Sequence, residues 1–308
     1  MRFGIALETF TPPGKKPDAT GIYETSTLAE VLGFGSLWVW DHILLGSRNV
    51  FPVLDSLTTL ASVGAKTSKV NLGTSVLIVA LRNPVVLAKV LSTIQYLTNG
   101  RLVIGAASGW YEREFKAVGV EFSKRGHIFE SRFNLVRKLL LASDVNYSED
   151  GFNLEHASME PRHPKKIPML MGGYSDTVLS RVGRISDGWV SYYYTPKAYS
   201  DSWKKIETSA RKCGRDPSTL RRVNIVPLSI GRDFDEADAR VRKFTSEYMD
   251  LPRGTDCSVE SSIRGTISEC IAQIRAYADS GVDELVFIPC NYDIEQVEKA
   301  GKEIIPEF

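Results

Sequence analysis

Hydrophobic positions along the chain fall into two alternating patterns. Short continuous apolar runs predict buried parallel strands, and longer stretches with apolar residues every three or four positions predict amphipathic helices. The strands are predicted at residues 3–7, 36–40, 70–79, 102–106, 168–171, 188–192, 222–230 and 285–288. The helices are predicted at residues 23–32, 52–65, 84–97, 129–142, 177–184, 198–212, 235–249, 267–280 and 294–304.

Eight strands, each followed by a helix, predict an α/β fold with a closed (β/α)8 TIM barrel and a single domain over residues 1–308. Two polar stretches interrupt the alternation, a hairpin or excursion at 144–164 and an irregular insertion at 250–264. Both insertions are expected at the C-terminal face of the strands, where they could cover the barrel mouth. A doubly wound open sheet is the competing fold. No G-x-G-x-x-G follows the first strand, which weakens that alternative for a dinucleotide binder.

Composition and charge narrow the function classes. The 38 basic and 37 acidic residues nearly cancel, so the charge balance gives no basis for binding nucleic acid or an anionic membrane. No apolar run approaches the roughly 20 residues that span a bilayer, and residues 1–8 begin as a strand rather than as a signal peptide. The four cysteines lack C-x-x-C spacing, so neither a disulfide framework nor a metal site is expected. These features fit a cytoplasmic enzyme.

The candidate chemistry lies where the predicted strands end, because the residues just past each strand of a parallel barrel converge on one face. Asp41 and His42 follow the second strand, and His42 is the only one of four histidines that follows a predicted strand. An acid beside a histidine can orient the imidazole or bind a ligand. The alternative is that Asp41 caps the next turn and His42 is merely half-buried.

Small and polar residues gather at the ends of the third and fourth strands: Thr74, Ser75 and Val76 after one, and Ser108, Gly109 and Trp110 after the other. Hydroxyls inside an apolar strand need partners, which a polar heterocycle or the neighbouring backbone could supply. Ser108 and Gly109 would form a floor and Trp110 an aromatic wall. Glu114 and Arg125 follow, and a structural pair between them is preferred over contact with the ligand.

The fifth strand ends in a glycine-rich turn that opens a helix: Gly172, Gly173, Tyr174 and Ser175, followed by Asp176. Glycines with Ser or Thr at a helix N-terminus make an anion pocket from backbone N–H groups, although Asp176 could instead cap the helix. Cations that could neutralise a phosphate, or simply keep the rim soluble, are Arg162, Lys165, Lys166 and Arg181. The strand ends as a whole suit a flat, phosphate-bearing redox cofactor.

Six segments, in order and at barrel spacing, carry a family resemblance. They are W-D-H at residues 40–42, G-T-S-V-L-I at 73–78, N-P-V-V-L-A-K at 83–89, G-R followed by G-W-x-x-x-E-F-x-x-x-G within 100–119, G-G-Y-S at 172–175, and D-G-W at 187–189. With these motifs the chain resembles the bacterial-luciferase-like superfamily of flavin and deazaflavin oxidoreductases, over nearly its whole length.

The resemblance implies a homodimeric (β/α)8 barrel that binds coenzyme F420 or FMN at the carboxyl face of the strands. Asp41 and His42 would lie near the ring, a non-proline cis peptide would join Ser75 to Val76, and Gly172, Gly173 and Ser175 would match the phosphate-binding turn. The preferred function is hydride transfer between a small organic substrate and F420. In it, His42 would hold the ring or shuttle a proton and Asp41 would orient His42. The alternatives are an FMN-dependent monooxygenase in which reduced flavin activates oxygen, and a catalytically silent relative.

One position departs from the family pattern. Some deazaflavin sugar-phosphate dehydrogenases carry a glutamate after the strand-four glycines, where this chain has Trp110. This departure puts a carboxylate acid/base and a sugar-phosphate substrate in doubt, and it predicts a more apolar pocket.

Overall fold

Eight parallel strands close into a barrel in the computed structural model, which describes residues 1–248 and 255–308. The barrel strands are β1 (Arg2–Ala6), β2 (Ser36–Val39), β3 (Asn71–Ile78), β4 (Leu102–Ala107), β7 (Met169–Gly172), β8 (Gly188–Tyr192), β9 (Arg221–Ile230) and β11 (Glu284–Pro289). The sheet closes because β9 pairs with both β8 and β11, and β11 pairs with β1. The predicted (β/α)8 barrel is confirmed, and the open-sheet alternative is excluded.

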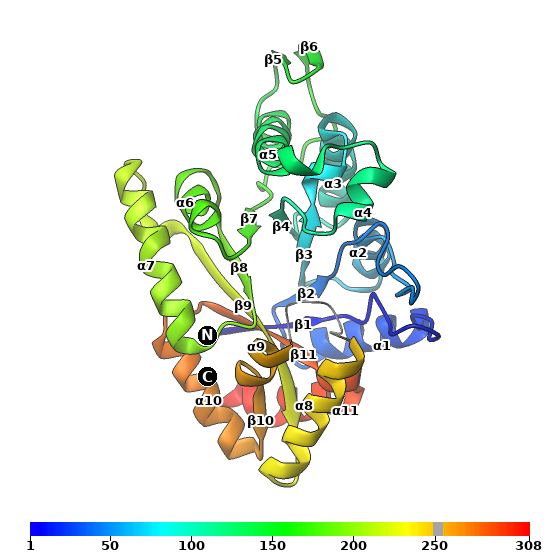
Figure 1. The fold of residues 1–308 in the computed structure, drawn as a ribbon, viewed down its shortest axis with the longest axis vertical. Coiled ribbons are helices and arrows are strands. Elements are labelled where there is room, and N and C mark those ends of the chain that lie inside the picture. Colours follow the sequence, from blue (N-terminus) through cyan, green and yellow to red (C-terminus); the bar gives the residue numbers. More distant parts are fainter. Residues whose placement is uncertain (249–254) are drawn as a thin grey trace.

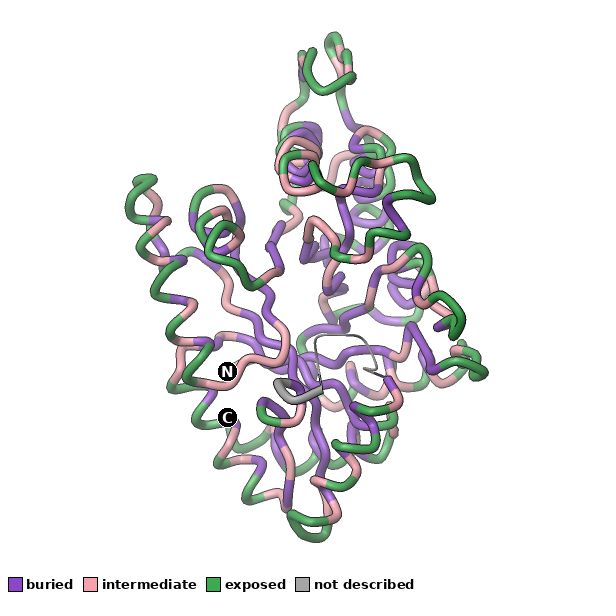
Figure 2. The backbone as a smooth tube through the Cα atoms, in the orientation of Figure 1, coloured by how far each residue is buried: buried purple, intermediate pink, exposed green. Residues whose placement is uncertain are grey.

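Helices surround the barrel, and the buried residues concentrate in the strands and on the inner helix faces (Figures 1 and 2). The helices are α1 (Ala19–Val31), α2 (Ser56–Lys66), α3 (Pro84–Leu97), α4 (Glu112–Ala117), α5 (Arg125–Leu141), α6 (Asp176–Ile185), α7 (Pro196–Lys212), α8 (Phe234–Tyr248), α9 (Thr255–Glu260), α10 (Ile267–Asp279) and α11 (Ile294–Lys299). A π-helical turn continues α11 over Ala300–Ile304. No helix in the described part of the chain is long and apolar enough to cross a membrane.

Trp38 lies in the interior of the barrel near the start of the strands, in a buried cluster with residues such as Val103 and Val286. Trp38 of β2 is buried, and a Cβ on Gly73 of β3 would lie 2.4 Å from its ring, so β3 needs glycine there. Buried Glu284 accepts hydrogen bonds from the Ser36 hydroxyl (2.5 Å) and from Trp38 Nε1 (3.3 Å). The buried polar groups of Ser36, Trp38 and Glu284 therefore satisfy one another's hydrogen bonds. They occupy the N-terminal end of the barrel interior, which leaves the C-terminal end for a ligand.

The insertion at 144–164 contains the predicted hairpin, formed by β5 (Val145–Glu149) and β6 (Phe152–Ala157). Its predicted position over the mouth is wrong. The hairpin packs along α5, where the Ser131 and Tyr147 hydroxyls are 3.4 Å apart and Lys138 Nζ donates to Asn146 O (2.9 Å). It therefore lies at the periphery (Figure 1). The reason is topological, because this segment links the end of a helix to the start of the next strand rather than following a strand.

The insertion at 250–264 is only partly described, since residues 250–254 lie outside the described residues. The remainder is regular rather than irregular, because it forms α9 and then β10 (Ile263–Gly265), which extends the sheet beside the end of β9. Val259 of α9 packs against the apolar cluster that includes Tyr192 and Tyr193. The described part of this insertion therefore lies beside the mouth.

Candidate active site

A buried carboxylate holds the candidate histidine in place. Glu114 of α4 is fully buried, and its Oε2 lies 3.0 Å from His42 Nδ1. Its Oε1 accepts hydrogen bonds from the backbone N–H groups of Ile43 (2.5 Å) and Leu44 (3.1 Å). A carboxylate acceptor at Nδ1 fixes the imidazole orientation and leaves Nε2 as the atom that can meet a ligand. The predicted Glu114–Arg125 pair is wrong, because Glu114 turns inward to His42 while Arg125 donates to Phe122 O and lies over the Phe122 ring.

Asp41 points to a different set of partners. Its Oδ1 accepts from the Ser56 hydroxyl (2.8 Å) and from Arg82 (2.7 Å), and its Oδ2 accepts from Ile78 N (2.8 Å). The expectation that Asp41 orients His42 is therefore corrected, because Glu114 makes that contact. Asp41 instead ties the end of β2 to the end of β3 and to the start of α2, so it shapes the rim of the mouth.

The end of β3 lies against β7 and β8. The Ser75–Val76 peptide is cis, as the resemblance implied, and the register of β3 against β4 shifts between Thr74 and Leu77. Buried Ser75 hydrogen-bonds Tyr192, and burial raises the pKa of Tyr192 well above its usual value, so its hydroxyl stays protonated at neutral pH. A Cβ on Gly172 would lie 2.7 Å from Val76 Cγ1, so β7 needs glycine at this contact.

Thr74 has the backbone partner that the sequence left as an alternative. Its hydroxyl is fully buried and donates to Gly105 O in the neighbouring strand (2.9 Å). The hydroxyl proton therefore has a partner within the sheet, and the assignment of Thr74 to cofactor binding stays a prediction.

The residues predicted to form a floor and a wall follow β4 directly. Ser108 is half-buried, and Gly109 has a φ of +81° in which a Cβ would lie 2.7 Å from Ile78 Cγ2. Trp110 stands edge-on to His42, with ring centroids 5.8 Å apart and an interplanar angle of 82°. The tips of β2, β3 and β4 therefore meet at His42, Ile78 and Trp110.

The glycine-rich turn after β7 begins the ten-residue helix α6. Gly173 has a φ of +133°, and its carbonyl accepts from Trp189 Nε1 (3.1 Å). The Ser175 hydroxyl caps the helix by accepting from Val178 N (3.3 Å), so Asp176 is not the cap and pairs instead with Lys205 (2.7 Å). The first N–H groups of a helix have no intrahelical acceptor, which keeps this turn suited to a phosphate. Tyr174 projects beside the turn and stacks on Tyr194 at 5.8 Å.

The four cations expected near this turn either lie at the other end of the barrel or are paired with an acid. Arg162 donates to Ala142 O (2.5 Å) at the end of α5. Arg162, Lys165 and Lys166 all precede β7, which puts them at the opposite end of the barrel from the strand tips. Arg181 is paired with Glu130 (2.8 Å). A phosphate at the start of α6 would therefore be held by backbone N–H groups and not by these four cations.

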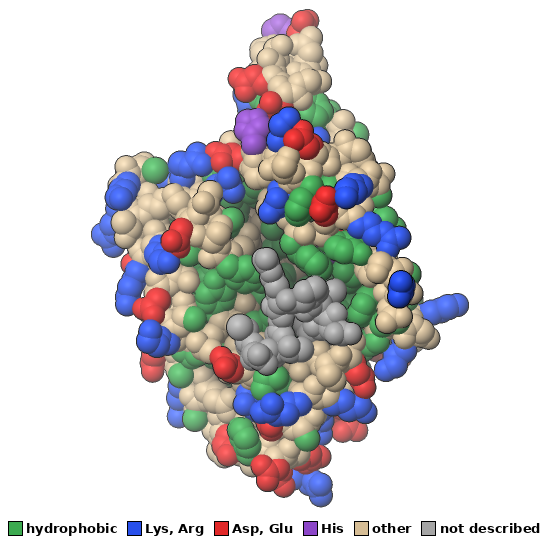
Figure 3. Space-filling model, viewed as in Figure 1, with side chains coloured by type: hydrophobic (Ala, Val, Ile, Leu, Met, Phe, Trp, Pro, Cys, Tyr) green, Lys and Arg blue, Asp and Glu red, His purple; other side chains and the backbone are tan. Residues whose placement is uncertain are grey.

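Several aromatic side chains and one carboxylic acid line the barrel mouth near the ends of β1 and β11. Trp40 lies 5.5 Å from the Tyr192 ring, and its Nε1 donates to the Tyr292 hydroxyl (3.0 Å). Glu8, which follows β1, accepts from the Tyr248 hydroxyl (2.6 Å), and burial raises the pKa of Glu8. A cavity of about 220 Å³ beside these tips is lined in part by Glu8 and Tyr292. Figure 3 shows hydrophobic side chains gathered around a hollow on the face where α9 lies.

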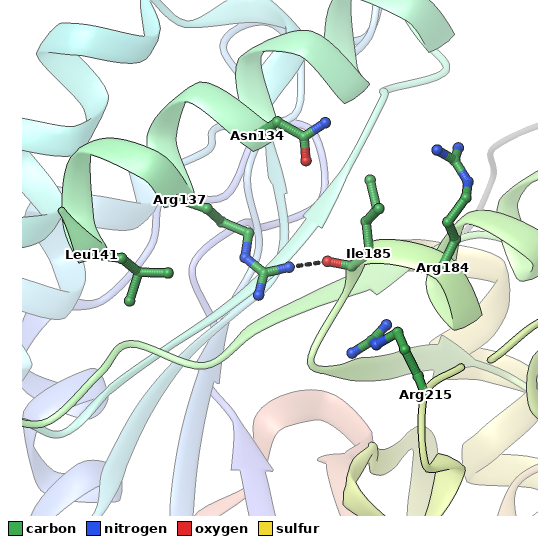
Figure 4. A pocket seen from close by; sticks show the side chains of 6 residues that line it. All are labelled: Asn134, Arg137, Leu141, Arg184, Ile185 and Arg215. Carbon is green, nitrogen blue, oxygen red and sulfur yellow. Dashed lines mark hydrogen bonds between the residues drawn. The ribbon is translucent and has the colours of Figure 1, made fainter. Parts of the chain in front are cut away.

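A second cavity, of about 370 Å³, lies between α5 and the end of α6 (Figure 4). It is lined by three arginines, but Arg137 donates to Ile185 O and pairs with Asp187 (3.0 Å), and Arg215 donates to Gly183 O (2.8 Å). These guanidinium groups cap the last turn of α6. The cavity is therefore part of the helix packing at the far end of the barrel, separate from the mouth.

Sequence reasoning did not assign Glu114 to His42 and did not single out Glu8. The position of Glu8 directly after the first apolar run was a usable signal, because Glu8 follows a strand in the same way as Asp41 does. For Glu114, the 72 positions that separate it from His42 leave no local pattern that specifies the pair.

Comparisons with known proteins find relatives and solved structures that match nearly the whole chain. The F420-dependent glucose-6-phosphate dehydrogenase of Amycolatopsis mediterranei is 25% identical over 312 residues, covering 93% of this chain and 94% of the relative. Among solved structures, an F420-dependent secondary alcohol dehydrogenase in complex with an F420-acetone adduct superposes with a TM-score of 0.82 at 18% identity, over 98% of both chains. A monooxygenase from Streptomyces bottropensis superposes with a TM-score of 0.85 at 19% identity, over 100% of this chain and 99% of that one. The family model described as luciferase-like monooxygenase matches residues 1–262. This chain therefore belongs to the luciferase-like monooxygenase family.

Proposed function

We propose that this protein is an F420-dependent oxidoreductase that moves a hydride between a small organic substrate and the deazaflavin ring. The observation that carries the proposal is the His42–Glu114 pair, which stands at the same barrel mouth as the Ser75–Val76 cis peptide and the glycine turn at Gly173. F420-dependent enzymes among the relatives and the superposed structures support the choice of cofactor.

The residues at the mouth fit such a cofactor. Glycine is required for packing at Gly109 and Gly172, where an added Cβ would lie 2.7 Å from Ile78 Cγ2 and from Val76 Cγ1, so both positions fix how the strand tips pack around the mouth. The N-terminus of α6 offers backbone N–H groups and the positive end of a helix dipole to the cofactor phosphate. When bound, the deazaflavin supplies the two-electron hydride chemistry that no side chain of the protein can perform.

The protein would contribute positioning, exclusion of water and one proton site. Glu114 holds His42 Nδ1, so His42 Nε2 is left to take a proton from a substrate oxygen or to return one. Trp40 and Tyr192 wall the mouth and keep water from the reacting carbon. Asp41 keeps the rim in shape through Ile78 N and Arg82.

An FMN-dependent monooxygenase is the second candidate, favoured by the family match and by the monooxygenase structure from Streptomyces bottropensis. Titration of the purified protein with each cofactor, followed by fluorescence and absorbance, separates the two functions. The proposal predicts saturable F420 binding at least tenfold tighter than FMN binding. Tight FMN binding with no response to F420 would overturn it.

We also propose a cytoplasmic homodimer of one-domain subunits. The support for the dimer is a stripe of exposed apolar side chains along one face of α3, formed by Val86, Val90 and Leu97. These positions are four and seven residues apart and so share a helix face, which a second copy of the same chain would cover. Light scattering coupled to size-exclusion chromatography tests the dimer. A Leu97→Glu variant that remains folded should run as a monomer, and a monomeric wild type would contradict the proposal.

A further inference from the structure

An exposed indole stands directly beside the candidate catalytic histidine. Trp110 leaves 47% of its surface accessible while its ring meets His42 edge-on at 5.8 Å. The neighbouring Tyr111 ring lies 5.3 Å from it and limits its movement. A large apolar side chain that is fixed and half exposed within reach of a catalytic group is typical of a substrate wall.

Two aliphatic side chains extend this apolar surface. Ile43 and Leu44 directly follow His42 in the chain, and they are 44% and 43% exposed. Their backbone N–H groups donate to Glu114 Oε1, at 2.5 Å and 3.1 Å, so the carboxylate that orients His42 also fixes these two residues. The apolar surface is thus held in a defined position relative to His42 Nε2.

The charges around this surface disfavour an anionic substrate. Arg82 is bound by Asp41 (2.7 Å) and Asp55 (3.1 Å), Arg125 lies over the Phe122 ring at 4.0 Å, and Arg113 donates to the backbone oxygen of Gly46 (3.1 Å). The N-terminus of α6 is already assigned to the cofactor phosphate. A substrate phosphate or carboxylate needs charge-assisted hydrogen bonds of its own, and the nearest acid to these apolar residues, Glu114, would repel it.

We propose that the substrate is a neutral, predominantly apolar alcohol or the corresponding carbonyl compound, with its hydrocarbon part on Trp110, Ile43 and Leu44. This inference rests on the proposed F420-dependent function. In the oxidation of a secondary alcohol, the carbinol C–H bond breaks and its hydride passes to F420, which with one proton from solvent becomes F420H2. The hydroxyl proton passes to His42 Nε2 as the C=O bond forms, and reduction of the ketone is the reverse.

The first test compares substrates on the wild-type protein. Reduction of F420 is measured with propan-2-ol, butan-2-ol, cyclohexanol, 1-phenylethanol and glucose 6-phosphate. We expect kcat/KM to rise about fourfold with each additional buried methylene, the ratio that corresponds to about 0.8 kcal/mol per CH2, and glucose 6-phosphate to give no saturable turnover. Turnover of glucose 6-phosphate with a kcat/KM above that of every alcohol would overturn the substrate assignment.

The second test removes the apolar wall and includes a readout that is independent of turnover. Binding of acetophenone to the cofactor-free protein is followed by saturation-transfer NMR. Trp110→Ala should abolish this binding and raise the KM for 1-phenylethanol at least tenfold, and Trp110→Phe should restore both. Leu141→Ala removes an equally exposed apolar side chain (47%) far from the mouth and serves as the control. Unchanged binding and KM in Trp110→Ala would overturn the substrate assignment, whereas failure of the wild type to bind F420 would overturn the proposed function instead.

Discussion

Replacing Glu114 tests whether one buried carboxylate organises the site. It accepts three hydrogen bonds, from His42, Ile43 and Leu44, at 3.0, 2.5 and 3.1 Å. Glu114→Gln preserves the size of the side chain and one carbonyl acceptor. However, the amide NH2 group of the glutamine would face one of these three donors in place of an oxygen acceptor. Glu114→Ala removes every acceptor.

The expected magnitudes follow from these contacts. Leaving a partly buried donor without an acceptor costs about 1–3 kcal/mol, so Glu114→Ala, which strands three donors including two backbone N–H groups, should lower the free energy of unfolding by about 3–6 kcal/mol. Glu114→Gln should cost about 1–2 kcal/mol, because one oxygen remains. Loss of a group that orients a catalytic histidine typically lowers activity about 10–100-fold, and we expect this loss in kcat for the Gln variant.

The assay combines urea unfolding, F420 titration and steady-state turnover of wild type, Glu114→Gln, His42→Ala and the double variant. If Glu114 acts through His42, the double variant should be no slower than His42→Ala alone, and the Kd for F420 should stay within about threefold. If the two effects multiply, or if Glu114→Gln retains wild-type kcat, the assignment of Glu114 as the positioning residue fails.

Three further predictions address other parts of the site. Asp41→Asn should lower the free energy of unfolding by about 3 kcal/mol in urea, because it breaks the buried pair with Arg82, yet reduce kcat less than His42→Ala does. Ser175→Ala should cost about 1 kcal/mol in thermal unfolding through loss of the α6 cap, and weaken binding of F420 more than that of a phosphate-free deazaflavin. Burial raises the pKa of Glu8 above 4.5, so the folded state binds the proton more tightly and stability falls as pH rises through the native pKa. Glu8→Gln should therefore be more stable than wild type above the native pKa of Glu8 and no more stable below pH 4.5. Unfolding measured across a pH series tests this, and equal stabilities of the two proteins at every pH would refute it.

The barrel was predictable because its strands are buried on both faces. Apolar runs such as residues 36–40 and 188–192 recur between helical patterns, and each lies within a residue of the strand observed, β2 and β8. Helix α3 matches its predicted bounds of 84–97, since Asn83 caps it and Pro84 occupies the first turn. The six-residue α4 was not predicted, because it is too short to show a helical period.

The sequence predicted which residues lie at the strand tips, but it did not predict which of their side chains contact one another. The order of the chain placed Asp41 next to His42, yet Asp41 turns toward Ile78 and Arg82 while Glu114 reaches His42 from another element. Side-chain direction at a strand end depends on how neighbouring tips pack, and no short-range pattern encodes that packing. The Ser75–Val76 cis peptide was expected from the family resemblance and not from the residues themselves.

A crystal structure of the protein with bound F420 is the most direct measurement of the central claim. The account predicts the deazaflavin ring against the Ser75–Val76 peptide with His42 Nε2 facing it, and the phosphate on backbone N–H groups of the turn that contains Gly173 and Ser175. A ring bound away from the strand tips, or a phosphate held in the arginine-lined cavity between α5 and α6, would contradict it.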